Sequence, residues 1–172
     1  MGTKVASTYA TLTIGYLEQK SYERIEDIFG LTFKREFISS WKRFLDDCFI
    51  SWTKSKADLD NFQNMLNTLH EYIKFTVESN VSQLPFLDCF VIKRNTGIET
   101  DIFYKPTDSK TYLLFTSSHP KHTKISIPFS LARRLRTIIS EEETFTKHTK
   151  ELEQLLLKQK YPKTVIKAGI YG

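Results

Sequence analysis

Two adjacent carboxylates, Asp46 and Asp47, stand between two short runs of aromatic and β-branched residues. The flanking runs predict a hairpin, so both aspartates fall at its turn. Like charges this close repel each other, and a divalent cation between them relieves the repulsion. Mg²⁺ is typically held by one or two carboxylates together with substrate phosphates. Asp46 and Asp47 are therefore candidate metal ligands; the alternative is that aspartate is simply a common turn residue.

A second group of residues could bind a polyanion. The net charge is +5, and residues 105–172 carry 13 Lys and Arg against 6 Asp and Glu, whereas residues 1–104 carry 12 against 14. Such an excess on helices favours nucleic acid as the partner, and a solvated helix face is the alternative. The candidate nucleic-acid-binding residues are Lys121, His122, Lys124, Arg133, Arg134 and Arg136.

Histidine and cysteine give weaker indications. His119 and His122 have a spacing that could hold a metal ion, but no third ligand follows nearby. Cys48 and Cys89 are far apart and form no CxxC motif, so the sequence predicts two free thiols rather than a disulfide framework or a zinc cluster.

Composition limits the class of protein. The chain has 172 residues, of which 40% are hydrophobic and 13% aromatic, with only 6 Gly and 5 Pro. These values exclude collagen-like and low-complexity chains and indicate one ordinary domain or two small ones. No apolar run approaches the ~20 residues that a membrane-spanning helix needs, so a membrane is not an expected partner.

Hydrophobic spacing predicts the elements that position these residues. Ser55 with Asp58 predicts a capping box at the start of one helix. In the N-terminal part the expected elements are a helix over Thr3–Glu18, a hairpin within residues 41–52, a helix of about five turns from Ser55 to Ile73, a strand over Lys74–Glu78, and a hairpin made of Phe86–Lys93 and Ile98–Tyr104.

Three helices are expected in the C-terminal part. One is short and lies near His119–Lys124, the next has Pro128 in its first turn, and the third is capped by Ser140 with Glu143 at its third position. The predicted fold class is α+β, with one unit over residues 1–104 and a helical unit over residues 105–172.

Several of these segments, in this order, resemble reverse transcriptases, and specifically those of Penelope-like retroelements. The stretch after residue 117 also resembles the helix-turn-helix-like segment found in animal copies of these elements. The resembling segments are Phe44-Leu45-Asp46-Asp47, residues 1–10 with Gly15–Glu18, Pro85–Asp88, Tyr104–Asp108, Ser117–Lys124 and Ser126–Pro128.

The resemblance implies RNA-directed DNA synthesis by the nucleotidyltransferase of a retrotransposon, with Mg²⁺ as the cofactor of the complete enzyme and an RNA template and a DNA primer as partners. Residues 1–104 would form an incomplete palm of antiparallel hairpins packed on helices, and residues 105–172 a small helical thumb. Asp46 and Asp47 would hold the catalytic metal, Gly2 and Thr3 would lie near template or nucleotide, and Lys74 could protonate the leaving pyrophosphate.

Two residues depart from the family pattern: Ser7 stands where members usually carry Pro, and Phe44 replaces a common Tyr. The fingers and the first palm strand, with a further metal-binding aspartate, would precede residue 1. Because two-metal phosphoryl transfer needs ligands that span both ions, we expect a fragment of a longer parent that is inactive alone. The alternatives are a non-catalytic nucleic-acid-binding module and a relic without function.

Overall fold

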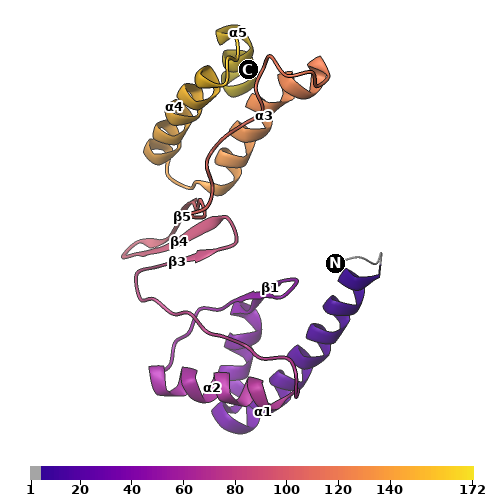
Figure 1. Cartoon of the computed structure of the whole chain (residues 1–172). Helices are drawn as coiled ribbons and strands as arrows, with labels where there is room; N and C mark the ends of the chain where they lie inside the picture. Colours follow the sequence, from indigo (N-terminus) through magenta and orange to yellow (C-terminus); the bar gives the residue numbers. More distant parts are fainter. Residues whose placement is uncertain (1–4) are drawn as a thin grey trace. The chain divides into compact units, whose positions relative to one another are not determined.

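The computed structural model describes residues 5–172, which divide into two compact units with the boundary between Ser79 and Asn80 (Figure 1). In the described residues the fold is α+β, as predicted, with five helices and two small antiparallel sheets. No helix in this part of the chain is both long and apolar enough to cross a membrane. The boundary between a palm and a thumb at residue 104 stays a prediction.

The first unit begins with a helix that is much longer than predicted, α1 (Ala6–Ser40). It bends at Gly30, whose backbone angles (φ 83°, ψ 166°) are not helical and suit a residue without a Cβ. The apolar residues whose spacing predicted the helix, from Val5 to Tyr16, are mostly exposed. Leu17 and Ile25 are buried instead, so the apolar spacing located the helix but not its buried side.

The core of the first unit combines aromatic and aliphatic side chains, and its aromatic rings hold a hairpin, β1 (Lys42–Phe44) and β2 (Asp47–Phe49). The Trp41 ring, just before β1, stacks on Phe37 with centroids 5.0 Å apart. The Trp52 ring, after β2, stacks on Phe62 at 5.4 Å. Aromatic pairs contribute about 0.5–1.5 kcal/mol beyond their buried area. The two strands pair antiparallel within the predicted residues, so the predicted hairpin is confirmed. The two tryptophan rings anchor both of its ends in the core.

The second helix, α2 (Lys56–Thr68), starts at the predicted capping box of Ser55 and Asp58. It is shorter than predicted because the His70 ring accepts the backbone N–H groups of Tyr72 and Ile73, which a continuing helix would use itself.

The strand predicted over Lys74–Glu78 is wrong, although the side chains of Phe75 and Val77 do pack on the core of the first unit. The Phe75 N–H donates to Asn67 Oδ1 at 2.6 Å, and the Phe75 carbonyl accepts from Asn67 Nδ2 at 3.1 Å. An amide side chain of α2 thus takes the place of a neighbouring strand.

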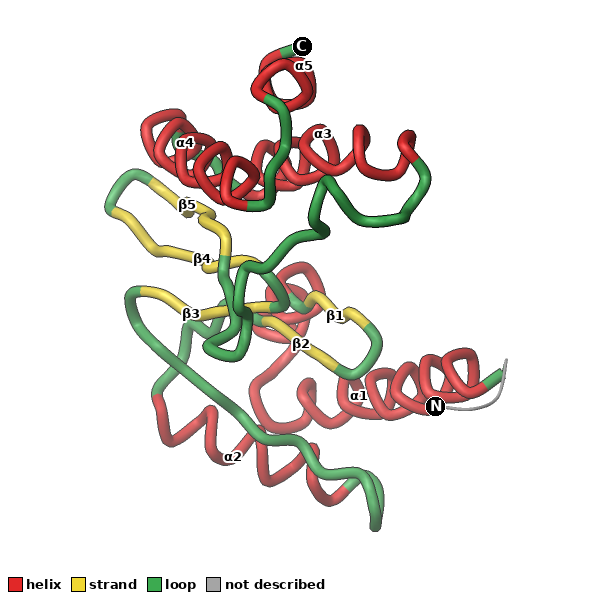
Figure 2. Tube along the Cα trace, turned by 45° about the horizontal axis from the view of Figure 1, so that its top comes forward, coloured by secondary structure: helices red, strands yellow, loops and turns green. Residues whose placement is uncertain are grey.

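The second unit combines a three-stranded sheet with three helices (Figure 2). The predicted hairpin is confirmed as β4 (Cys89–Arg94) and β5 (Gly97–Ile102), and β3 (Gln83–Phe86) was not predicted. Pro85 weakens the strand signal in the sequence, but an edge strand tolerates proline. The helices are α3 (Lys121–Ile138), α4 (Glu142–Lys158) and α5 (Lys163–Tyr171).

Two predicted helix starts are wrong. Pro128 lies inside α3 rather than in a first turn, because the short helix near residue 119 and the next one form a single helix. Ser140 does not cap α4, whose N-cap residue is Glu141. The Ser140 hydroxyl instead accepts the backbone N–H of Thr100 at 3.0 Å, and the Ser140 N–H donates to the Thr100 carbonyl at 3.0 Å. Ser140 therefore joins the helices to the edge of β5.

Helix α5 crosses α3 at Gly169, where the two backbones approach closely. A Cβ atom at this position would lie 2.6 Å from Cβ of Pro128 and 2.9 Å from the backbone nitrogen of Phe129. Pro128 is buried at the crossing. The core around it is formed by Ile102, Ala132, Leu135, Ile139, Leu152, Leu156, Tyr161 and Ile166.

Replacing Gly169 with alanine is expected to destabilise the second unit by about 1–3 kcal/mol, because the added methyl group overlaps atoms of α3. In an open helix the same change stabilises by about 1 kcal/mol, so the sign is diagnostic. Urea unfolding followed by circular dichroism measures the difference, with Thr164→Ala, at an exposed position of α5, as the control. A more stable Gly169→Ala protein would contradict the close crossing.

Candidate functional site

Asp46 and Asp47 lie at the tip of the β1–β2 hairpin. Phe44 pairs with Asp47, so Leu45 and Asp46 form the turn, and Leu45 has a positive φ of 55°. Both aspartates are exposed, and no other described residue forms a hydrogen bond or an ion pair with either carboxylate. A positive φ at a non-glycine residue costs of order 1–3 kcal/mol, so the tip has a specific backbone shape that the rest of the unit maintains.

Arg43 links this tip to α1. Its Nε lies 3.1 Å from Glu18 Oε2, and its Nη1 donates to the Leu45 carbonyl at 3.1 Å. Both side chains of the ion pair are largely buried, which strengthens the interaction over that of a solvated pair. The hydrogen bond from Arg43 to the Leu45 carbonyl therefore fixes the backbone next to Asp46.

The donor atoms at the tip fit Mg²⁺ in kind, because it commonly takes one or two carboxylates and completes its shell with water and phosphate oxygens. Among residues 5–172 there is no group of three or more His, Cys, Asp and Glu side chains that could hold a metal ion. Asp46 and Asp47 could contribute two ligands of a metal site, and the remaining ligands would be water or phosphate oxygens. For His119 and His122 the described residues offer no third protein ligand.

The resemblance also singles out Gly2, Thr3 and Lys74 as substrate-binding residues. Gly2 and Thr3 lie outside the described residues. Lys74 Nζ donates to the carbonyls of Asn67 and His70 at 2.8 and 3.2 Å, so its charge stabilises the C-terminal end of α2. The substrate-binding role of Lys74 stays a prediction.

Pro85–Asp88 forms a second turn like the one at the hairpin tip. Phe86 pairs with Cys89, and Leu87 has a φ of 58°, so the sequence Phe-Leu-Asp makes a similar turn twice in the chain. Here the aspartate has a partner, because Asp88 Oδ2 accepts hydrogen bonds from Arg134 Nη2 at 2.8 Å and from Arg134 Nε at 3.0 Å. This contact gives Asp88 a role that its sequence context did not reveal.

The residues predicted to bind nucleic acid all lie on α3. With 3.6 residues per turn, Phe129, Arg133 and Thr137 follow one another along one exposed side, opposite the buried Ala132 and Leu135. We call this exposed side the basic face of α3; it consists of His122, Ser126, Phe129, Ser130, Arg133, Arg134, Arg136 and Thr137.

The predicted basic residues differ in how their charge is used. Lys124 turns inward, donates to the Ser117 carbonyl at 2.8 Å and lies 5.4 Å from the Phe115 ring centroid. Arg136 pairs with Glu142, and Arg134 with Asp88. Lys121, His122 and Arg133 are exposed, and no side-chain partner for them exists among the described residues.

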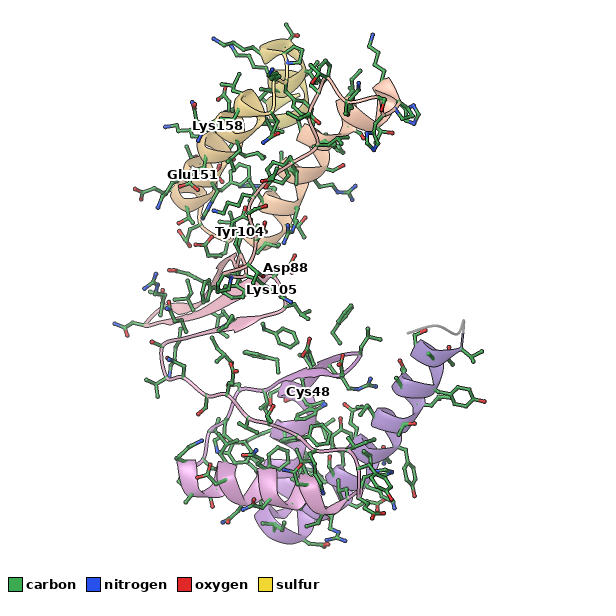
Figure 3. The ribbon with its side chains drawn as sticks, viewed as in Figure 1. Cys48, Asp88, Tyr104, Lys105, Glu151 and Lys158 are labelled. Carbon is green, nitrogen blue, oxygen red and sulfur yellow. The ribbon has the colours of Figure 1, made fainter. Side chains whose placement is uncertain are left out.

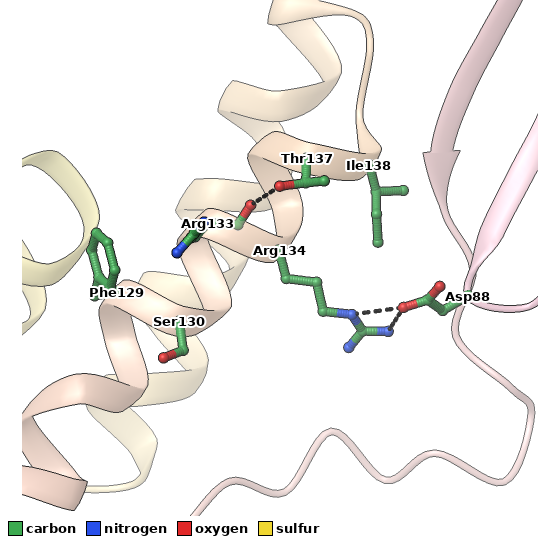
Figure 4. Close-up of a pocket in the computed structure, with 7 residues that line it drawn as sticks. All are labelled: Asp88, Phe129, Ser130, Arg133, Arg134, Thr137 and Ile138. Carbon is green, nitrogen blue, oxygen red and sulfur yellow. Dashed lines mark hydrogen bonds and ion pairs between the residues drawn. The ribbon is translucent and has the colours of Figure 1, made fainter.

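Arg133 and Arg134 also line a pocket of about 480 Å³ (Figure 4). Helix α3 contributes most of its lining, and Asp88 closes one end from the turn between β3 and β4. The lining residues are Asp88, Phe129, Ser130, Arg133, Arg134, Thr137 and Ile138.

The sequence reasoning missed four exposed lysines around the connection between α4 and α5, because α5 was not predicted. Residues 159–162 form this connection, and Lys160 adopts a positive φ of 62° within it. Pro162 before the apolar pair Val165 and Ile166 was the available signal for a helix start. The lysines are Lys158, labelled in Figure 3, Lys160, Lys163 and Lys167.

Burial raises the pKa of the Cys48 thiol on β2 (Figure 3) to about 11, with Glu18 as the next cause. Burial raises the pKa of Tyr22 to about 12, again with Glu18 contributing. Both groups favour their neutral forms in the folded state, so the stability they contribute is complete below pH 9 and is lost as the pH rises through 11 and 12. Near neutral pH the raised pKa of Cys48 favours the thiol over the reactive thiolate.

We expect native Cys48 to react with iodoacetamide about 100-fold more slowly than in the urea-unfolded chain near pH 8, because a pKa raised by two units lowers the thiolate fraction by about that factor. Mass spectrometry of the alkylated peptide measures both rates, and the native rate should keep rising up to about pH 11. Equal rates in the folded and unfolded chain would show that Cys48 is not buried.

The C-terminal helices are similar to a known family. Residues 111–171, which include α3, α4 and α5, match the animal helix-turn-helix domain. No curated protein and no solved structure matches the chain. The match confirms the helix-turn-helix-like resemblance of the segment after residue 117 and points to nucleic acid as the partner of this part of the chain.

Proposed function

We propose that the second unit binds nucleic acid through the basic face of α3. The observation that carries this proposal is the position of Arg133, which is exposed in the middle of that face without a carboxylate partner, within a segment similar to the animal helix-turn-helix domain. A guanidinium group in this setting is suited to phosphate, because its planar donors match phosphate oxygens.

The composition of α3 supports the proposal. The helix contains no Asp or Glu between Lys121 and Ile138, so a polyanion meets no repulsion from its own residues. Hydroxyl groups accompany the charges, since Ser130 and Thr137 lie beside Arg133. Hydroxyl and guanidinium groups together are typical donors to the phosphates and sugars of nucleic acids.

The connection between α4 and α5 also carries exposed basic residues. In helix-turn-helix domains the second helix enters the major groove while the first crosses the backbone. Lys163 and Lys167 are exposed on α5, and Lys160 precedes it, so this helix could contact phosphates on either side of a groove. We propose α5 as a second contact region.

Replacing Arg133 with alanine should weaken binding to duplex DNA about tenfold, because one charge-assisted phosphate contact is lost. The slope of log affinity against log salt should fall by about one. Fluorescence anisotropy with a labelled duplex between about 50 and 200 mM salt measures both effects.

The matched control for this prediction is Lys147→Ala, which also removes one exposed positive charge but lies on α4 next to Glu143 and Glu151. Lys147→Ala should change the duplex affinity less than about twofold, as expected for a charge outside the contact region. Equal losses in the two variants would mean that only net charge matters, and no binding by the parent chain would refute the proposal.

We also propose that the chain is a fragment of an RNA-directed DNA polymerase that is inactive alone, and the hairpin tip of the first unit favours this proposal. We infer that Asp46, with Asp47, holds Mg²⁺ there, and that an RNA template with a DNA primer is the nucleic acid bound. Bound Mg²⁺ would neutralise the phosphates of an incoming nucleotide. The support comes from two exposed, unpartnered carboxylates on a turn that Arg43 fixes to α1, within a segment that resembles the metal-binding hairpin of reverse transcriptases.

Asp46→Asn should reduce Mg²⁺-dependent binding of a deoxynucleoside triphosphate by about tenfold or more, because one anionic ligand is lost. Duplex binding should be unchanged or slightly stronger. Isothermal titration calorimetry with and without Mg²⁺ measures the first effect, and anisotropy the second. Asp27→Asn is the control, since Asp27 is an exposed aspartate next to Glu26 on α1. A similar reduction in both variants would argue against a metal site at the hairpin tip.

A further inference from the structure

We propose that the pocket beside Arg133 is a subsite for one unpaired nucleotide, in which the Phe129 ring stacks on the base and the Arg133 guanidinium binds the adjoining phosphate. The inference rests on the proposed nucleic-acid binding and deepens it, because it names single-stranded nucleic acid as the class of ligand for this part of the surface.

Phe129 places an aromatic ring at the surface of α3. The residue is 53% exposed and lines the pocket, although large aromatic side chains dominate protein cores. Its backbone is not free to move inward, because α5 crosses at Gly169, close to the Phe129 nitrogen. The crossing therefore fixes the backbone that presents this aromatic ring at the surface, where a base can reach it for stacking.

The spacing between the Phe129 ring and the Arg133 charge suits one nucleotide. Phe129 and Arg133 are separated by one helical turn, about 6 Å along the axis, on the same side of α3. One nucleotide joins a flat base to a phosphate over a comparable span. The Ser130 hydroxyl lies between them in sequence and has no partner among the described residues, so it is available to the sugar or the phosphate.

An ion pair lies at the other end of the pocket. Asp88 holds Arg134 through two hydrogen bonds to one carboxylate oxygen, as the dashed lines in Figure 4 show. This ion pair carries no net charge, whereas the Arg133 guanidinium has no carboxylate partner among the described residues, so the pocket favours a single phosphate near Arg133. A volume of about 480 Å³ lies within the range of small-molecule sites.

These features favour an unpaired nucleotide over a base pair. In a duplex each base face is covered by its neighbours, so an aromatic side chain can stack only on an unpaired or terminal base. A positively charged groove with an aromatic ring is the usual arrangement of proteins that bind single strands. Arg133 would serve both ligands, whereas Phe129 would serve the single strand alone.

The test compares three variants of the full chain: Phe129→Leu, Phe129→Trp and the control Ile125→Ala, an exposed apolar residue of α3 that does not line the pocket. Each is titrated by anisotropy with a labelled oligothymidylate, an oligouridylate and a DNA hairpin duplex. Phe129→Leu should lose about tenfold in affinity for the single strands and less than about twofold for the duplex, because leucine keeps the apolar volume but removes stacking. Phe129→Trp should retain single-strand binding.

A spectroscopic signal separates stacking from a structural role. The Phe129→Trp chain should lose indole fluorescence when oligothymidylate is added, beyond any change seen in the parent chain. Circular dichroism verifies that all variants are folded. Equal losses for single strand and duplex in Phe129→Leu, or unchanged single-strand binding, would overturn the subsite. If duplex binding still depends on Arg133 in that case, the proposed function stands without it; absence of binding to every probe refutes both.

Discussion

The close crossing of α5 over α3 at Gly169 is the constraint on which the second unit depends. A side chain at this position would overlap Pro128 and the backbone of Phe129, so the crossing needs glycine on one helix. Pro128 lacks an N–H group and cannot donate the usual helical hydrogen bond to the carbonyl of Lys124, a loss that costs roughly 3 kcal/mol in an ordinary helix. The buried contact with α5 offsets this cost and directs the basic face outward.

Contacts with neighbouring residues determine which basic side chains of α3 remain available to a ligand. A single helix carries six basic candidates, but Lys124 turns inward onto Phe115, and Arg134 and Arg136 meet carboxylates. Exposed ion pairs contribute little to stability, so these contacts mainly position side chains and mask charge. Among the described residues, the candidates that keep no side-chain partner are Lys121 and His122 in the first turn of α3, and Arg133, which lines a pocket together with Phe129. The structure thus reduces six basic candidates on α3 to three.

The first unit uses a related turn for a different purpose. Phe-Leu-Asp occurs at two turns, and in both the leucine has a positive φ. At residue 88 the aspartate is neutralised by an arginine, whereas at residue 46 the carboxylate stays exposed and the supporting arginine contacts the backbone beneath it. Trp41 and Trp52, each stacked on a phenylalanine of the core, anchor the hairpin that carries Asp46. The same local sequence therefore yields either a masked or an available carboxylate, depending on the neighbouring basic residue.

The sequence by itself determined the features that depend on neighbours in the chain. Both hairpins and the Ser55–Asp58 capping box follow from local hydrogen bonding and side-chain alternation, and the fold class follows from them. Charge counting located the basic region, and two free thiols were expected and found.

Only the tertiary structure decided the rest. Ser140 pairs with Thr100, far away in sequence, instead of capping α4, and Asn67 takes the place of a strand beside Phe75. It also decided which side of α1 is buried, that Asp88 neutralises Arg134, and that Phe129 stays at the surface. Each of these outcomes depends on residues distant in sequence that compete for the same backbone group, charge or space. Local pattern carries no information about which competitor prevails.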